Sequence, residues 1–151
     1  MDPKFRPNVA GILQRQEDGR ILIGERLNVE GAWQFPQGGV DEGESSEEAL
    51  VREMWEEIGL APSEFEVVEC RGGYRYKFPH GKVKWGEFVG QEQTYFLCRL
   101  CGEESAIRLD RHKQEFSQIR WILPEEFDLA WLPSFKRDVY ARVLHDFFGI
   151  G

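Results

Sequence analysis

The sequence predicts an α/β protein in which a mixed β-sheet lies between helices. Strand-like apolar segments occur before, between and after two segments of helical character, which is typical of an α/β/α arrangement. No internal repeat, low-complexity tract or linker divides the 151 residues. A chain of this length buries roughly two thirds of its unfolded surface, so we expect a single domain that covers residues 1–151.

The strands are indicated by apolar runs and by the turn signals between them. Asp18-Gly19 is a strong hairpin signal, so the segments on either side of it are expected to pair. Gly72-Gly73 is expected to end one strand, and residues 79–82 are expected to form a turn. The expected strands cover residues 5–13, 20–26, 66–70, 74–78, 94–100 and 119–123.

Two helices are expected, with a short helical turn between them at residues 124–127. In the first helix, Ser45 and Glu48 have the spacing of a capping box, and Gly59 can end the helix. Its apolar side chains gather on the side where a core is expected: Leu50, Val51, Met54, Trp55 and Ile58. In the second helix, Ser134 is the expected N-cap, and apolar residues recur at every fourth position: Phe135, Val139, Val143 and Phe147.

Bulk composition excludes several classes of protein. The hydrophobic content of 41% and the aromatic content of 13% are those of a globular chain, and no long apolar run or signal-peptide pattern is present. We therefore expect a soluble, cytoplasmic protein with no membrane partner. Three cysteines are an odd number and predict no disulfide framework. Cys98 and Cys101 form a CxxC, but without a second pair a zinc site is not expected.

The acidity of the chain is concentrated in one stretch. Between Asp41 and Glu57, eight acidic residues and one base, Arg52, give a local charge of −7, whereas the whole chain carries −8. On a helix, three of these glutamates fall within about 100° of one another: Glu53, Glu56 and Glu57. Carboxylates on one face repel each other, and a hard divalent cation such as Mg²⁺ would offset that repulsion. A solvated acidic face is the alternative.

The spacing of this stretch resembles the Nudix box at every defined position: Gly38, five residues, Glu44, seven residues, Arg52-Glu53-Met54, one residue, Glu56-Glu57, one residue, Gly59-Leu60. The resemblance implies the Nudix fold and a hydrolase that cuts a diphosphate linkage with Mg²⁺, Mn²⁺ or another divalent metal as cofactor. It implies catalytic and metal-binding roles for Glu53, Glu56 and Glu57, with Gly38 at the metal site and Arg52 steadying the glutamates. A Nudix-fold binding module without catalysis is the alternative, but such modules usually have broken box glutamates, whereas this box is intact.

A second resemblance covers nearly the whole chain. The segments that carry it are similar to those of the bacterial RNA pyrophosphohydrolases: Arg6-Pro7-Asn8-Val9, WQFPQGG at 33–39, GQEQ at 90–93, Glu115-Phe116 with Arg120-Trp121, and SFKRDVY at 134–140. The resemblance implies removal of pyrophosphate from the 5′-triphosphate end of RNA. Diadenosine tetraphosphate hydrolases share part of the set, so hydrolysis of dinucleoside polyphosphates or nucleoside triphosphates is the alternative. DNA is not an expected partner, and a homodimer is left open.

The second resemblance also implies roles for residues outside the box. Glu115 would complete the metal site, and the substrate-binding residues would be Arg6, Arg26, Gln37, Lys113, Phe135 and Lys136. An arginine presents a planar fork to phosphate, and a phenylalanine offers a face on which a base can stack. Read from the residues alone, Phe135 could equally be a core residue.

The segment from Arg71 to Lys84 contains five bases and no acids. Such a strip could follow a nucleic-acid backbone. It could equally be the solvated edge of a hairpin, where lysines discourage strand pairing. The sequence favours neither interpretation.

Overall fold

The computed structural model describes residues 2–151, and in this range it contains seven strands and two α-helices. The helices are α1 (Ser46–Ile58) and α2 (Ser134–Phe148). The strands are β1 (Lys4–Gln14), β2 (Ile21–Arg26), β3 (Trp33–Gln34), β4 (Gln37–Gly39), β5 (Phe65–Lys77), β6 (Phe88–Leu100) and β7 (Phe116–Ile122). Neither helix has the length and apolar character needed to cross a membrane.

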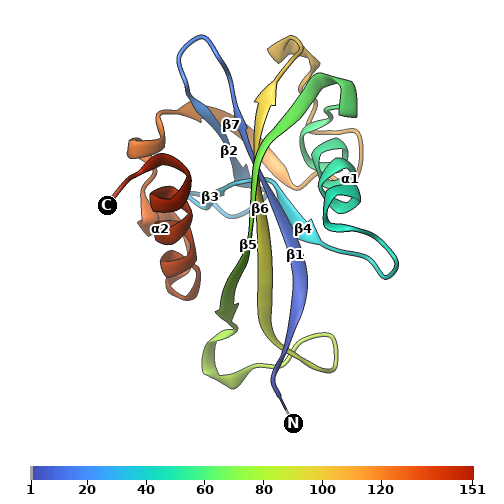
Figure 1. Ribbon diagram of the computed structural model, residues 1–151, viewed down its shortest axis with the longest axis vertical. Helices are drawn as coiled ribbons and strands as arrows, with labels where there is room; N and C mark the ends of the chain where they lie inside the picture. Colours follow the sequence, from blue (N-terminus) through green and yellow to red (C-terminus); the bar gives the residue numbers. More distant parts are fainter. Residues whose placement is uncertain (1) are drawn as a thin grey trace.

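All seven strands belong to one mixed sheet (Figure 1). Its main path runs β3-β2-β1-β6-β5, with β4 paired to β1 and β7 paired to β2. The central pair, β1 and β6, is parallel over its whole length, whereas the other pairs are antiparallel. The short strand β4 thereby carries residues 37–39 to the middle of the sheet, where it contacts α1.

The two helices cover opposite faces of the sheet (Figure 1). Successive side chains of a strand point to opposite faces, so each central strand contributes to two cores. In β1, Val9 and Leu13 pack in the core under α1, while Ala10 and Ile12 pack in the core under α2. The predicted fold, a mixed sheet between helices, is therefore confirmed.

The capping signals of α1 are also confirmed. The Ser45 hydroxyl accepts a hydrogen bond from the Glu48 N–H at 3.1 Å, and the Glu48 carboxylate accepts one from the Ser45 N–H at 3.0 Å. Gly59 ends the helix in the left-handed conformation. These two ends set which residues of the acidic stretch are helical, and hence which of them face the sheet.

The inner face of α1 differs from the expected one. The expectation that Trp55 lies in the core is wrong, because its side chain is 41% exposed. The Arg111 guanidinium lies over the indole at 4.5 Å from the ring centroid, so Trp55 stacks on a cation instead of packing in the core. Two carboxylates are buried on the inner face: Glu53 is 8% exposed and Glu57 is 6% exposed.

Several expected element boundaries are also wrong. β5 continues through the two glycines, because Gly73 adopts a φ of 85° at an irregularity in the β5–β6 pairing and the pairing resumes at Tyr74. β6 begins at Phe88, well before residue 94. Ser134 is the first helical residue of α2, and Pro133 occupies the N-cap position without a side-chain hydrogen bond. β3 and β4 are only two and three residues long, too short for a visible periodicity.

Ser45→Ala should lower the free energy of unfolding by about 1 kcal/mol, because alanine cannot accept the Glu48 N–H hydrogen bond. Urea denaturation followed by circular dichroism measures the change. Ser46→Ala is the matched control, since the cap hydrogen bonds belong to Ser45 and Glu48, and it should keep wild-type stability. Equal stability of the two variants would contradict the assignment of the cap.

Candidate active site

Close backbone contact holds the loop and the helix of the acidic stretch together. β4 pairs with β1, so that Gly38 lies opposite Val9 and beside α1. A Cβ at Gly38 would overlap the Glu53 carboxylate. Only glycine lets a backbone approach another group this closely. The peptide groups of β4 are therefore presented directly to the inner face of α1.

Arg52 links the loop before α1 to the glutamates of the helix. Its Nε and Nη2 donate to the two carboxylate oxygens of Glu44 at 2.9 Å each, and Nη2 also donates to the Gly39 carbonyl oxygen at 2.8 Å. Its Nη1 donates to Glu53 at 2.7 Å and to Glu56 at 3.3 Å. Two parallel bonds between a guanidinium and a carboxylate are a strong form of ion pair, and the pair lowers the pKa of Glu44 to about 2.

Glu57 is the most deeply buried carboxylate of the stretch. It accepts a hydrogen bond from the Gln37 N–H at 3.0 Å. Burial raises the pKa of Glu57 well above its usual range, and repulsion from Glu53 and Glu115 adds to the rise. Burial also raises the pKa of Glu53, although the Arg52 guanidinium opposes that shift. Carboxylates perturbed in this way gather at functional sites.

A cavity of about 300 Å³ opens beside Glu57. Its walls come from segments that are far apart in the sequence: Arg26, Gln34, Gln37, Glu57, Tyr76, Phe78, Lys84, Gln91, Glu115, Pro133, Phe135 and Lys136. The cavity thus joins six of the predicted site residues: Arg26, Gln37, Glu57, Glu115, Phe135 and Lys136. It combines two carboxylates with three cations and three aromatic rings.

A buried hydrogen-bond network positions Gln37 at this cavity. The Gln93 amide nitrogen donates to Asn8 Oδ1 and to Gln37 Oε1, both at 2.9 Å. The Tyr95 hydroxyl donates to Gln93 Oε1 at 2.8 Å. Gln93 is only 1% exposed, and its side-chain nitrogen and oxygen are both hydrogen-bonded. A satisfied polar side chain at that depth specifies one arrangement. The network ties the side chain of β4 to β1 and β6.

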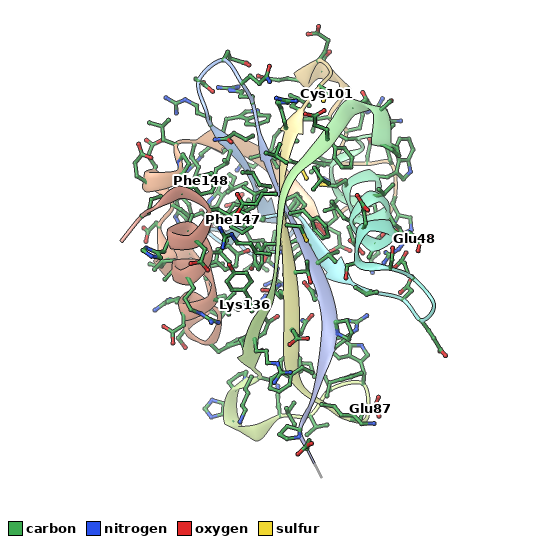
Figure 2. The ribbon with its side chains drawn as sticks, viewed as in Figure 1. Glu48, Glu87, Cys101, Lys136, Phe147 and Phe148 are labelled. Carbon is green, nitrogen blue, oxygen red and sulfur yellow. The ribbon has the colours of Figure 1, made fainter. Side chains whose placement is uncertain are left out.

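The surroundings of Lys136 disfavour its positive charge. It lies on the side of α2 that faces the sheet (Figure 2), with its Nζ 5.7 Å from the centroid of the Tyr76 ring. Burial, together with the charges of Arg26 and Lys84, lowers the pKa of Lys136 from 10.5 to about 8. Three neighbouring cations repel one another in the free protein, and an anionic ligand would relieve that repulsion.

Other predicted residues are not among those that line the cavity. Arg6 projects from β1 beside Gly39, where a side chain would overlap its guanidinium, and its charge reaches Tyr76 in the cavity wall. Lys113 is exposed in the loop before β7 and is not part of the wall. Phe135 packs against the core under α2 and also lines the cavity, so its position agrees with either of the two roles that the sequence left open.

Sequence reasoning missed half of the wall: Gln34, Tyr76, Phe78, Lys84, Gln91 and Pro133. Some signal was present, since Gln34 and Gln91 belong to the WQFPQGG and GQEQ segments. Within residues 2–151, Tyr76 Oη and Gln91 Oε1 are buried and have no hydrogen-bond partner. Buried polar atoms are normally paired, so these two atoms are available to a ligand.

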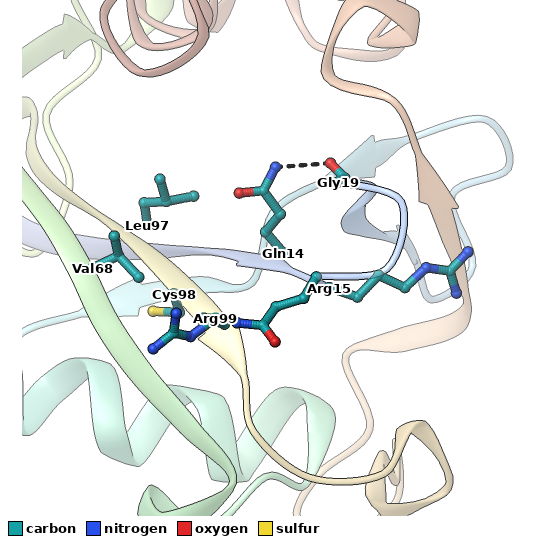
Figure 3. A pocket seen from close by; sticks show the side chains of 8 residues that line it. Gln14, Arg15, Gly19, Val68, Leu97, Cys98 and Arg99 are labelled. Carbon is teal, nitrogen blue, oxygen red and sulfur yellow. Dashed lines mark hydrogen bonds between the residues drawn. The ribbon is translucent and has the colours of Figure 1, made fainter.

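A second cavity, of about 470 Å³, lies at the β1–β2 hairpin (Figure 3). The described residues of its wall include two arginines but no carboxylate. The Gln14 amide donates to the Gly19 carbonyl oxygen at 2.8 Å, which braces the hairpin (Figure 3). Burial raises the pKa of the Cys98 thiol to about 12, so this cysteine is not a nucleophile. Cys98 is buried and Cys101 is exposed, so the two thiols of the CxxC lie in different environments.

The fold and the box define the class of this protein. The family model described as NUDIX domain matches residues 4–143, and the chain belongs to the Nudix family. The solved structure of an Ap4A hydrolase binary complex from C. elegans has a TM-score of 0.66 at 16% identity and covers 96% of this chain and 99% of its own. The E. coli dihydroneopterin triphosphate pyrophosphohydrolase has a TM-score of 0.67 at 18% identity, with 94% and 98% covered. At these identities, the likeness is one of fold alone.

The more similar relatives carry one particular name. The RNA pyrophosphohydrolase of Cellvibrio japonicus is 42% identical, over 94% of this chain and 85% of the relative. The RNA pyrophosphohydrolase of Pseudomonas aeruginosa is also 42% identical, over 94% and 91%. That of Alkalilimnicola ehrlichii is 43% identical, over 94% and 80%.

Nudix hydrolases generally use divalent metal ions, and the donor groups of this chain are of the right chemical kind. Within residues 2–151, no three acidic, histidine or cysteine side chains already form a coordinating set. Arg52 instead holds Glu53 and Glu56. The carboxylates are hard oxygen donors, and buried Glu57 is repelled by Glu53 and Glu115. A divalent cation bound to these carboxylates would offset both the cost of burying their charge and their mutual repulsion, so the residues fit such an ion.

Lys136→Met should stabilise the protein at pH 7 by about 1–3 kcal/mol, because it removes a cation whose pKa is lowered from 10.5 to about 8. A lysine with a lowered folded-state pKa destabilises the fold at pH values below 8, and the penalty disappears as the pH rises to 10.5. Urea denaturation over that pH range measures the difference between variant and wild type.

The matched control is Lys77→Met, which changes an exposed lysine at the end of β5. It should leave stability nearly unchanged at every pH. If the gain from Lys136→Met is the same at pH 7 and at pH 10.5, the stabilisation comes from packing and not from removal of the charge.

Proposed function

We propose that this protein is a divalent-metal-dependent RNA pyrophosphohydrolase, a single Nudix domain that removes pyrophosphate from the 5′-triphosphate end of RNA and leaves a 5′-monophosphate. One observation carries the proposal: a single cavity combines box and metal-site carboxylates with a stacking ring and a cluster of cations. A 5′-triphosphorylated nucleotide needs all three, because it has a phosphate chain to hydrolyse and a base to hold. The relatives at 42% identity over 94% of the chain support it.

Five residues would hold the metal, Mg²⁺ or a similar divalent ion such as Mn²⁺: Gly38, Glu53, Glu56, Glu57 and Glu115. When bound, the metal supplies neutralisation of the phosphate charge and acidification of the attacking water. A carboxylate of this set accepts the proton of that water. Because Glu53 and Glu57 repel each other, the carboxylates titrate as a coupled set rather than one by one.

Arg52 would orient the catalytic glutamates. Its Nη1 bonds Glu53 and Glu56, while its other donors are anchored on Glu44 and Gly39. The anchored side of the guanidinium keeps the arginine in place when the glutamates engage a metal. Its positive charge also lowers the repulsion within the acidic face.

The cations and rings of the cavity would bind the 5′ end of the RNA. The residues that we assign to substrate binding are Arg6, Arg26, Gln37, Lys113, Phe135 and Lys136. Phe135 offers a ring face to a base, and Lys136 is placed to donate to a base edge or a phosphate. All these groups come from one chain, so the proposal does not require a homodimer. It places the protein in the cytoplasm together with its RNA substrate, with neither DNA nor a membrane as partner.

Comparison of three substrates tests the proposal: a short 5′-triphosphorylated RNA, diadenosine tetraphosphate and GTP, each with and without Mg²⁺. We expect the highest kcat/KM on the RNA, with pyrophosphate or successive phosphates released and no turnover without metal. A higher kcat/KM on diadenosine tetraphosphate would favour a dinucleoside polyphosphate hydrolase. Absence of turnover on all three with Mg²⁺ or Mn²⁺ would favour a binding module.

Glu56→Gln should lower kcat by about two to four decades, or roughly 3–5 kcal/mol at 1.36 kcal/mol per decade, because it removes a metal-binding charge and keeps the side-chain shape. Glu47→Gln, at an exposed position in the first turn of the same helix, is the matched control and should keep the wild-type rate. Thermal unfolding should be the same for both. If Glu56→Gln retains more than about a third of the activity at saturating Mg²⁺, its assignment to the metal site is wrong.

A further inference from the structure

An exposed tryptophan stands in the β5–β6 loop (residues 78–87), at the lower end of the molecule in Figure 1. Trp85 is 55% exposed and has a φ of 51°, a conformation that is strained for any residue with a bulky side chain. The loop is nevertheless held, since the Lys84 N–H donates to the Phe88 carbonyl oxygen at 2.8 Å. A braced loop that presents a large aromatic ring to solvent in a strained conformation points to a binding role.

One face of the Trp85 ring is held by a cation–π contact. The Arg6 guanidinium covers that face at 4.1 Å from the ring centroid. Phe78 and Phe88 contact the indole at tilts of 55° and 67°, so neither ring stacks flat upon it. Since Trp85 is nevertheless 55% exposed, the face turned away from Arg6 is the one on which a flat π-system can lie.

A continuous line of rings joins Trp85 to the active-site cavity. Phe135 and Tyr76 both line the cavity, with ring centroids 5.6 Å apart. Tyr76 is 6.2 Å from Phe78, and Phe78 is 6.0 Å from Trp85. Tyr76 and Phe78 are themselves buried, so they connect the cavity to the loop within the fold. A nucleic-acid strand whose 5′ base lies on Phe135 would pass over them to reach Trp85.

The charges near the loop suit a phosphate backbone. The two arginines of the basic segment 71–84 are paired with glutamates of β5 and β6. Glu87, the acidic residue of the loop, is labelled in Figure 2. Its carboxylate is paired with Lys4. Within residues 2–151, no carboxylate lies within ion-pair distance of three lysines at the loop end of the segment: Lys77, Lys82 and Lys84. Unneutralised lysines beside an exposed aromatic ring are the combination that binds single-stranded nucleic acid.

We propose that the β5–β6 loop is a second RNA-binding site, at which a base downstream of the 5′ end stacks on the face of Trp85 turned away from Arg6 and the loop lysines contact the adjoining phosphates. The inference rests on the proposed function, because its occupant is the single-stranded 5′ segment of the RNA substrate. Stacking and phosphate contacts carry little sequence information. The site therefore makes the enzyme prefer longer RNA over short RNA, with little preference for the base at this position.

The test compares kcat/KM on a 5′-triphosphorylated dinucleotide and on an octanucleotide. Trp85→Ala should lower the value on the octanucleotide about tenfold, the contribution of one stacked base, and leave the value on the dinucleotide unchanged within about twofold. Trp85→Phe keeps an aromatic face and should retain most of the activity on the octanucleotide. Val83→Ala changes another exposed side chain of the same loop and is the matched control, with no effect on either substrate.

Equal losses on the two substrates would overturn the inference, because Trp85 would then act on the catalytic site through Arg6. The inference would also be overturned if Trp85→Ala left kcat/KM on the octanucleotide unchanged, or if it changed the oligomeric state and not the activity on RNA. If Trp85→Ala does not fold, Lys82→Gln takes its place, since it removes a loop charge without touching a ring, and the same dependence on length is expected.

A binding measurement separates this inference from the proposed function. Fluorescence anisotropy with a labelled 5′-hydroxyl octanucleotide requires no hydrolysis, and Trp85→Ala should weaken binding about tenfold. If binding depends on Trp85 while the wild type hydrolyses no RNA triphosphate, the proposed function fails and the RNA site stands. If the wild type hydrolyses RNA and Trp85→Ala binds as tightly as wild type, the loop site fails and the proposed function stands.

Discussion

Two carboxylates of like charge, Glu53 and Glu57, are buried between α1 and the sheet, and the surrounding structure depends on holding them there. A buried charge without a partner is strongly unfavourable. Arg52 donates to Glu53, and the Gln37 N–H donates to Glu57. Both carboxylates still have raised pKa values. The protein therefore carries a local electrostatic penalty that a divalent cation would remove.

The same constraint accounts for the short strand β4. Its peptide groups must lie against α1, which is possible because residue 38 is a glycine whose backbone abuts the Glu53 carboxylate. Its Gln37 side chain is tied to Gln93 of β6, and Gln93 is tied to Asn8 of β1. Through this chain of hydrogen bonds, the central parallel pair of the sheet determines where the glutamates of α1 meet the cavity. A small shift of β1 against β6 would therefore move Gln37, and with it the hydrogen bond that Glu57 accepts.

The cavity beside these carboxylates contains groups that lower the stability of the folded protein. Lys136 is held near two other cations, with its pKa lowered to about 8. Tyr76 and Gln91 place unpaired polar atoms in the same wall. Each feature lowers the stability of the fold and would favour a ligand that carries negative charge and hydrogen-bonding groups. The cost in stability reaches into the core under α2, because Tyr76 belongs both to that core and to the cavity wall.

The sequence by itself determined the features that depend on neighbours along the chain. The capping box, the spacing of the glutamates on one helix, the hairpin at Asp18-Gly19 and the fold class all follow from local periodicity and turn chemistry. Only the tertiary structure decided the features that depend on distant partners. Residues 90–93, of which Gln91, Glu92 and Gln93 are polar, became part of β6 because β1 and β5 pair with them on either side. Trp55 is exposed while Glu53 and Glu57 are buried. The two carboxylates can be buried because the Arg52 guanidinium donates a hydrogen bond to Glu53 and the backbone of β4 lies against α1. The cavity wall could not be read from the chain, since a cavity is formed by the packing of β2, β5, β6 and α2, and no local pattern records that packing.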